Sequence, residues 1–101
     1  MNEKFNMKEK MNKAVITVVG KDTEGILAKV CTYLAKAQIN ILDVSQTIVQ
    51  DYFNMMMIVD YTKTSKKHFE DVASDLAEIG VEMGLKIRCQ KAEIFEKMHR
   101  V

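Results

Sequence analysis

The stretch Val19-Gly20-Lys21-Asp22-Thr23-Glu24-Gly25-Ile26 decides how this chain folds. An apolar, β-branched run over residues 14–19 predicts a strand that stops at Gly20, and a helical pattern begins near Glu24. Gly20 and Gly25 lack a Cβ, so the backbone of the turn can approach a ligand closely. The first N–H groups of the following helix are unpaired and point outward. This turn is therefore the first candidate for a binding site.

The composition predicts one soluble domain of modest size. The chain has 101 residues, 48% hydrophobic residues and a net charge of +1, which gives no electrostatic argument for nucleic acid or an anionic membrane surface. No apolar run is long enough for a spanning helix, and the N-terminus lacks the apolar core of a signal peptide, so we expect a cytoplasmic protein. Residues 1–12 are predicted to be a flexible extension, and residues 13–101 a single domain.

The apolar periodicity predicts the order strand, helix, strand, strand, helix, strand. This order is typical of an α+β, ferredoxin-like βαββαβ sandwich, with two helices on one face of a four-stranded antiparallel sheet. We expect Thr23 and Ser65 to cap the two helices, and Asn40 to take a left-handed conformation after the first. The predicted strands cover 13–19, 41–49, 52–61 and 85–91, the helices 24–37 and 66–83, and a short C-terminal helix 92–99.

One face of this sheet has no cover from the two helices. On either parity of the third strand, Met55 and Met57 or Met56 and Ile58 point away from them. An exposed apolar patch of that size is unusual on a monomer, which predicts a homo-oligomer, most simply a dimer. The alternative is that the N-terminal arm or the C-terminal helix covers the face.

Nothing in the sequence indicates catalysis, a metal or another cofactor. The chain has no CxxC or HExxH pattern, and Cys31 and Cys89 are interpreted as buried thiols within apolar elements. His68 and His99 have no carboxylate or cysteine at motif spacing, so no enzyme is predicted. On residue types alone, Gly20, Asp22 and Gly25 fit either a tight structural turn or a ligand site.

The run from Ala14 to Val30, with its G-x-D-x-x-G-I turn, resembles the opening of an ACT domain. Residues 38–46, QINILDVSQ, resemble the family's entry to the second strand, and the likeness extends over about residues 13–91. It is closest to small stand-alone ACT proteins similar to half of the glycine cleavage system transcriptional repressor. The resemblance implies dimers with ligands near this turn and near the start of a neighbour's second strand. Carried across by position, the ligand-binding candidates are Gly20, Asp22, Gly25, Ile26, Asn40 and Ile41.

The resemblance therefore implies a non-catalytic regulatory homodimer that senses an amino acid or a similar small metabolite as its effector. The charge and the apolar pattern predict no nucleic acid or membrane partner. Glu24 stands where many family members have proline, and its charge disfavours a ligand carboxylate beside the helix start. The alternative is a structural protein that docks a partner enzyme or regulator through the apolar face of its sheet. RNA binding is disfavoured because the first strand has no aromatic residue.

Overall fold

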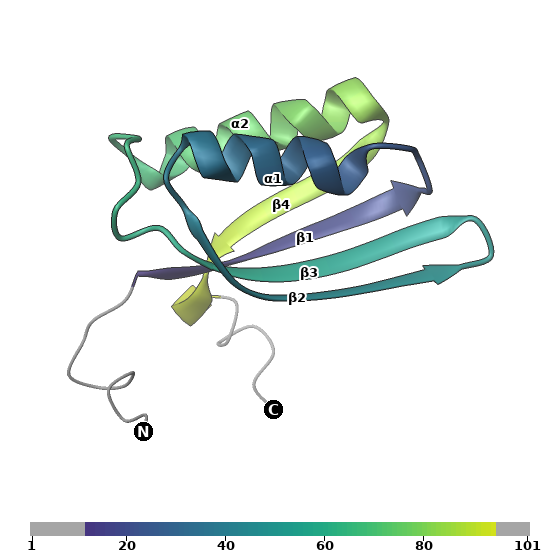
Figure 1. Cartoon of the computed structure of the whole chain (residues 1–101), viewed down its shortest axis with the longest axis horizontal. Coiled ribbons are helices and arrows are strands. Elements are labelled where there is room, and N and C mark those ends of the chain that lie inside the picture. The colour runs from purple at the N-terminus through teal and green to yellow at the C-terminus, as the bar shows by residue number, and fades with distance from the viewer. Residues whose placement is uncertain (1–11, 95–101) are drawn as a thin grey trace.

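The computed structural model describes residues 12–94, which form a sheet with two helices on one side (Figure 1). The sheet is fully antiparallel, and its strand order is β2-β3-β1-β4. The predicted ferredoxin-like βαββαβ architecture is confirmed. The elements are β1 (Lys13–Lys21), α1 (Ile26–Lys36), β2 (Asn40–Val49), β3 (Tyr52–Asp60), α2 (Phe69–Met83) and β4 (Leu85–Lys91).

Both predicted terminal features lie partly or wholly outside the described residues. Residues 92–94 are helical, which is the start of the predicted C-terminal helix, and its remainder lies beyond the description. The predicted extension over residues 1–12 is described only at Asn12, whose backbone carbonyl accepts a hydrogen bond from the Tyr61 N–H at 2.8 Å.

The core lies between the two helices and the sheet. Ile16 of β1, Met57 of β3, Leu34 of α1 and Leu76 of α2 have no exposed surface. Because side chains alternate along a strand, this parity directs Met56 to the opposite face, where it is 41% exposed. We call that side the open face, since α1 and α2 both lie on the other side of the sheet (Figure 1).

Two glycines are required by packing rather than by turn formation. A Cβ on Gly20 would lie 2.6 Å from Leu85 Cδ2 and 3.2 Å from Leu85 Cα. A Cβ on Gly80, inside α2, would lie 2.8 Å from the Leu85 carbonyl oxygen. The glycines therefore allow β1 and α2 to approach β4 closely. Gly84, at φ 74°, ends α2.

The predicted helix caps were wrong. Gly25, at φ 83°, is the N-cap of α1, and the Thr23 hydroxyl instead donates to the Lys21 carbonyl at 3.0 Å. The N-cap of α2 is His68, whose N–H donates to Asp71 at 3.3 Å, while the Ser65 N–H donates to the Ala37 carbonyl beyond the end of α1. The left-handed residue after α1 is not Asn40 but Gln38, at φ 60°.

Strand β2 contains an irregularity near its start. A β-bulge between Ile41 and Asp43 shifts the register, so Ile41 lies on the helix side with Val44 rather than with Asp43. Alpha-helix α1 makes few contacts with β2, whereas α2 packs over β4. As a result Val44 is 40% exposed and Ile48 is 53% exposed, although both lie on the helix side of the sheet.

Candidate functional site

The turn between β1 and α1 combines a structural glycine with an accessible one. Nothing lies within 4 Å of a Cβ added at Gly25, although its positive φ favours glycine. The space beside Gly25 is therefore open. Gly20 differs, because its lack of a side chain is explained by Leu85.

The other two candidates in this turn have restricted roles. Ile26 is only 3% exposed and belongs to the core, so only its backbone can face a ligand. The Asp22 N–H donates to the Asp51 carbonyl at 2.8 Å, which ties the turn to the β2–β3 hairpin. Asp22 and Asp51 consequently lie at the same end of the sheet as Glu24.

Asn40 and Ile41 lie at the opposite end of the sheet. Asn40 pairs with Asp60, and Asp60 pairs with Lys13, the first residue of β1, whereas Gly20 comes near the end of that strand. Seven residues of strand separate these rows by roughly 23 Å. One chain therefore cannot bring the two groups of candidates into a single small-molecule site.

Asn40 lines a hollow of about 490 Å³ that also contains groups of both charges. Asp60 is fixed there, since its Oδ1 accepts hydrogen bonds from the N–H and the hydroxyl of Thr62. Within residues 12–94, no ion pair is found for the ammonium of Lys63. The hollow is lined by Gln38, Ile39, Asn40, Asp60 and Lys63.

Sequence reasoning found Asn40 but missed Gln38, Asp60 and Lys63. Asp60 ends a strand and Lys63 lies in the loop that follows, and neither belongs to a recognisable motif. Only the pairing of Asn40 with Asp60 could have linked them, and that pairing depends on the register of β2.

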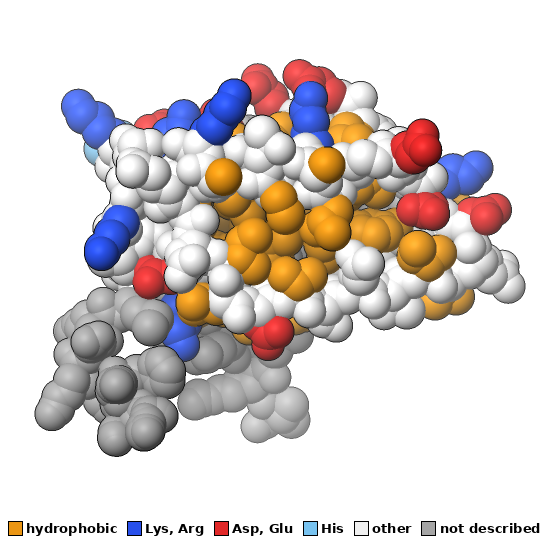
Figure 2. Space-filling view, in the orientation of Figure 1, with side chains coloured by type: hydrophobic (Ala, Val, Ile, Leu, Met, Phe, Trp, Pro, Cys, Tyr) orange, Lys and Arg blue, Asp and Glu red, His pale blue; other side chains and the backbone are white. Residues whose placement is uncertain are grey.

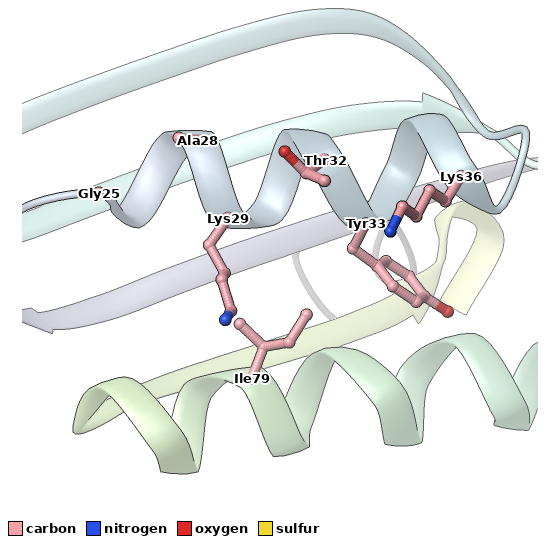
Figure 3. A pocket seen from close by; sticks show the side chains of 7 residues that line it. All are labelled: Gly25, Ala28, Lys29, Thr32, Tyr33, Lys36 and Ile79. Carbon is pink, nitrogen blue, oxygen red and sulfur yellow. The ribbon is translucent and has the colours of Figure 1, made fainter.

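A second hollow, also about 490 Å³, lies between α1 and α2 and includes Gly25 (Figure 3). Lys29, Lys36 and Tyr33 point toward it from α1, opposite Ile79 of α2. Nearby, the Tyr33 hydroxyl donates to Asp75 at 2.6 Å, and the Lys66 ammonium lies 3.1 Å from Asp75.

These contacts perturb the titration of two groups and join the helices. Burial and the hydrogen bond to Asp75 raise the pKa of Tyr33. The same hydrogen bond, together with Lys66, lowers the pKa of Asp75. Because each side chain already has a partner, we interpret this cluster as a link between α1, α2 and the loop before α2.

The cysteines and histidines supply no reactive centre among the described residues. Cys31 and Cys89 are free and partly buried against the core, and burial raises the pKa of Cys89 to about 12. The thiolate is therefore disfavoured at Cys89. Residues 12–94 contain no group of three His, Cys, Asp or Glu side chains that could hold a metal ion. None of their helices has the length and apolarity to cross a membrane.

The fold is that of a small ferredoxin-like domain, and its candidate residues form two groups at opposite ends of the sheet. Residues 12–90 match the ACT domain family, and the chain belongs to that family. It is 57% identical over 91 residues to a UPF0237 protein of Bifidobacterium longum, covering 90% of this chain and all of that relative. A UPF0237 protein of Listeria monocytogenes is 47% identical over 89 residues, which cover 88% of this chain and 99% of that protein.

Solved structures agree with this assignment. An ACT domain protein from Streptococcus pneumoniae is 40% identical with a TM-score of 0.72, covering 86% of this chain and 97% of that one. A glycine cleavage system transcriptional repressor matches with a TM-score of 0.70 and 23% identity, over 80% of this chain and 46% of that one. At that identity the second likeness shows the fold alone.

Proposed function

We propose that this chain is a non-catalytic regulatory protein that binds a small zwitterionic metabolite, an amino acid, and acts as a homodimer. The hollow beside Asn40 carries this proposal, because it offers an ammonium, a carboxylate and two amide side chains around one small space. Charged groups of both signs are what the ends of a zwitterion require. Membership of the ACT family supports a regulatory role.

In this proposal Lys63 binds the ligand carboxylate, and the amides of Asn40 and Gln38 orient it. The ligand ammonium faces Asp60, whose position is fixed by Thr62. This orientation agrees with the charge of Glu24, which disfavours a carboxylate at the start of α1. Gly20, Asp22, Gly25 and Ile26 then contribute from the turn of a second copy.

Regulation would follow from a shift between the unpaired and paired states of the chain. A ligand that contacts both copies binds the pair more tightly than the single chain, so it favours the pair by mass action. No covalent chemistry is needed. Ligand binding would then change the affinity between copies, or the exposure of a surface that binds a regulated partner.

Calorimetric titration of the full chain with the twenty amino acids tests the proposal. We expect heat from one amino acid or a few related ones, and none from the matching amines or carboxylic acids that lack one charge. Lys63→Met should abolish this heat, whereas Lys67→Met, an exposed lysine of the same loop outside the hollow, should not. The proposal fails if the folded protein gives no heat with any amino acid, or if Lys63→Met binds like the wild type.

The alternative function is a structural protein that docks a partner enzyme or regulator. It is favoured by exposed apolar side chains on the open face, including Met56 at 41%, Val19 at 46% and Tyr52 at 58%. Affinity capture with the wild type and with Met56→Lys tests it, since a specific partner should be lost from the variant. Met57 is unsuitable for this test because it is fully buried.

A further inference from the structure

Apolar side chains are exposed on both sides of the sheet. One group lies between α1 and β2 (Figure 2) and includes Leu27 and Ile48. The other lies on the open face, where Met56 and Val19 are 41% and 46% exposed. Because the strand order is β2-β3-β1-β4, the chain that leaves β4 starts at the edge farthest from the first group. The open face is therefore the apolar surface that this part of the chain can reach.

The burial of Val15 indicates that one end of the open face is covered. By alternation with the buried Ile16, the Val15 side chain points to the open face, yet it is only 6% exposed. It does not belong to the core cluster between the sheet and the helices. Its cross-strand neighbours are Ile58 and Gln90, and β4 ends at Lys91. The buried position on this face therefore lies close to the point where the chain leaves the sheet.

The chain turns away from α1 and α2 as it leaves β4. Residues 92–94 are helical, and in Figure 1 they lie below the strands, whereas α1 and α2 lie above them. Ile94 is 48% exposed at the end of the described part of the chain. Seven further residues follow it, with the sequence FEKMHRV. The helical residues therefore lead this segment toward the open face.

The sequence of the segment predicts a helix with one apolar side. Its apolar residues recur at spacings of three and four, and they are Ile94, Phe95, Met98 and Val101. Glu93, Glu96 and Arg100 fall on the opposite side of the same helix. A helix of this kind is stable only when its apolar side is buried against another surface.

The length of the segment matches the distance that it has to cross. Ile58 lies two strands across from the end of β4 and two residues along, which is roughly 12 Å. Six residues of helix separate Ala92 from Met98 by about 9 Å, and the Met98 side chain can span the rest. Phe95 lies half-way along this path, over Val15.

We propose that residues 94–101 form an intramolecular cover, which packs Phe95 against Val15 and Met98 against Ile58 on the open face. This proposal goes beyond the proposed function and does not rest on it. The cover buries apolar area that α1 and α2 do not reach, which stabilises the fold. A partner protein can use this end of the open face only after the segment is displaced, so the segment competes with any such partner.

Thiol labelling of the full chain tests the cover, with far-UV circular dichroism to verify that each variant folds. Val15→Cys, combined with Cys31→Ser and Cys89→Ser, leaves one thiol at position 15. We expect slow labelling, and a rate higher by roughly tenfold or more after Phe95→Ser, because the buried ring holds the segment in place. Glu96→Ser, on the opposite side of the segment, is the matched control and should leave the rate unchanged.

Disulfide trapping tests where the segment lies. Ile58→Cys with Met98→Cys, in a chain that also carries Cys31→Ser and Cys89→Ser, should form a disulfide within one chain under mild oxidation. Ile58→Cys with Arg100→Cys should form it much more slowly, because position 100 points away from the sheet. The mass under non-reducing conditions distinguishes a bond within one chain from a bond between two chains.

Three results would overturn the proposal. If Phe95→Ser leaves the labelling rate at position 15 unchanged, the segment does not cover Val15. If the Met98→Cys and Arg100→Cys chains form the disulfide at equal rates, the segment does not pack with its apolar side on the sheet. If the disulfide joins two chains, a second copy occupies the open face instead. If Val15→Cys fails to fold, the trapping experiment alone decides.

Discussion

Gly20→Ala separates the structural role of the first motif glycine from a role in ligand binding. The added Cβ would lie 2.6 Å from Leu85 Cδ2 and 3.2 Å from Leu85 Cα, and Leu85 is only 8% exposed. The Cδ2 methyl can rotate, but the backbone of β4 cannot move without disturbing its pairing with β1. We therefore expect an overpacking cost of about 1–3 kcal/mol in the free energy of unfolding.

The assay is urea denaturation followed by circular dichroism, at one protein concentration for all variants because association of copies would change the apparent stability. Leu85→Ala alone should cost about 2–5 kcal/mol by leaving a cavity. In Gly20→Ala/Leu85→Ala the new methyl group enters that cavity. The free energy of unfolding lost by the double variant should therefore be smaller than the sum of the two single losses, by at least about 1 kcal/mol. Additive losses would refute the packing explanation, and so would a Gly20→Ala protein as stable as the wild type.

The structure makes three further predictions. Gly80→Ala should lower the melting temperature, corresponding to a loss of about 1–2 kcal/mol, although alanine favours a helix, because its Cβ would meet the Leu85 carbonyl oxygen at 2.8 Å; a stabilised variant in thermal denaturation would contradict this. Gly25→Ala should lose about 1 kcal/mol from its positive φ alone and Gly25→Asn less, measured by urea denaturation; equal losses would contradict a conformational origin. The raised pKa values of Tyr33 and Cys89 mean that the folded state favours their protonated forms, so their contribution is complete below the ordinary values of 10.0 and 9.0 and is lost as pH rises above them. In a series of denaturation measurements at increasing alkaline pH, the free energy of unfolding should therefore decline less for Tyr33→Phe than for the wild type. Equal slopes of this free energy against pH would contradict the prediction.

The arrangement of the core could be predicted from the sequence only up to the parity of β3. The alternatives Met55 with Met57 and Met56 with Ile58 are equally apolar, so nothing local distinguishes them. The structure places Met57 opposite Ile16, and both are fully buried. That choice is made by the register with β1, which is a tertiary property.

The residues of the candidate site were predicted individually, but their positions relative to one another were not. The turn from Gly20 to Ile26 was found from its residue types, and Asn40 from the family resemblance. They lie at opposite ends of the sheet because of the directions in which the paired strands run, and those directions are known only once the pairing is known. The bulge near Asp43 had no signal in the sequence, because Ile41 and Leu42 are both apolar and either can face the core.

By itself, the sequence determined the element order, the sheet topology and the turn at Gly20 to Ile26, because apolar periodicity, glycines and strand propensities act over a few neighbouring residues. Only the tertiary structure decided what the two glycines of that turn do. Gly20 is required by contact with Leu85, which lies 65 positions further along the chain but beside Gly20 in the sheet, whereas Gly25 borders open space. It also decided that α1 leaves β2 uncovered, since the coverage of a sheet depends on how far each helix reaches across it. The separation of Asn40 from the turn, at opposite ends of the sheet, is what makes a second copy part of the proposed site.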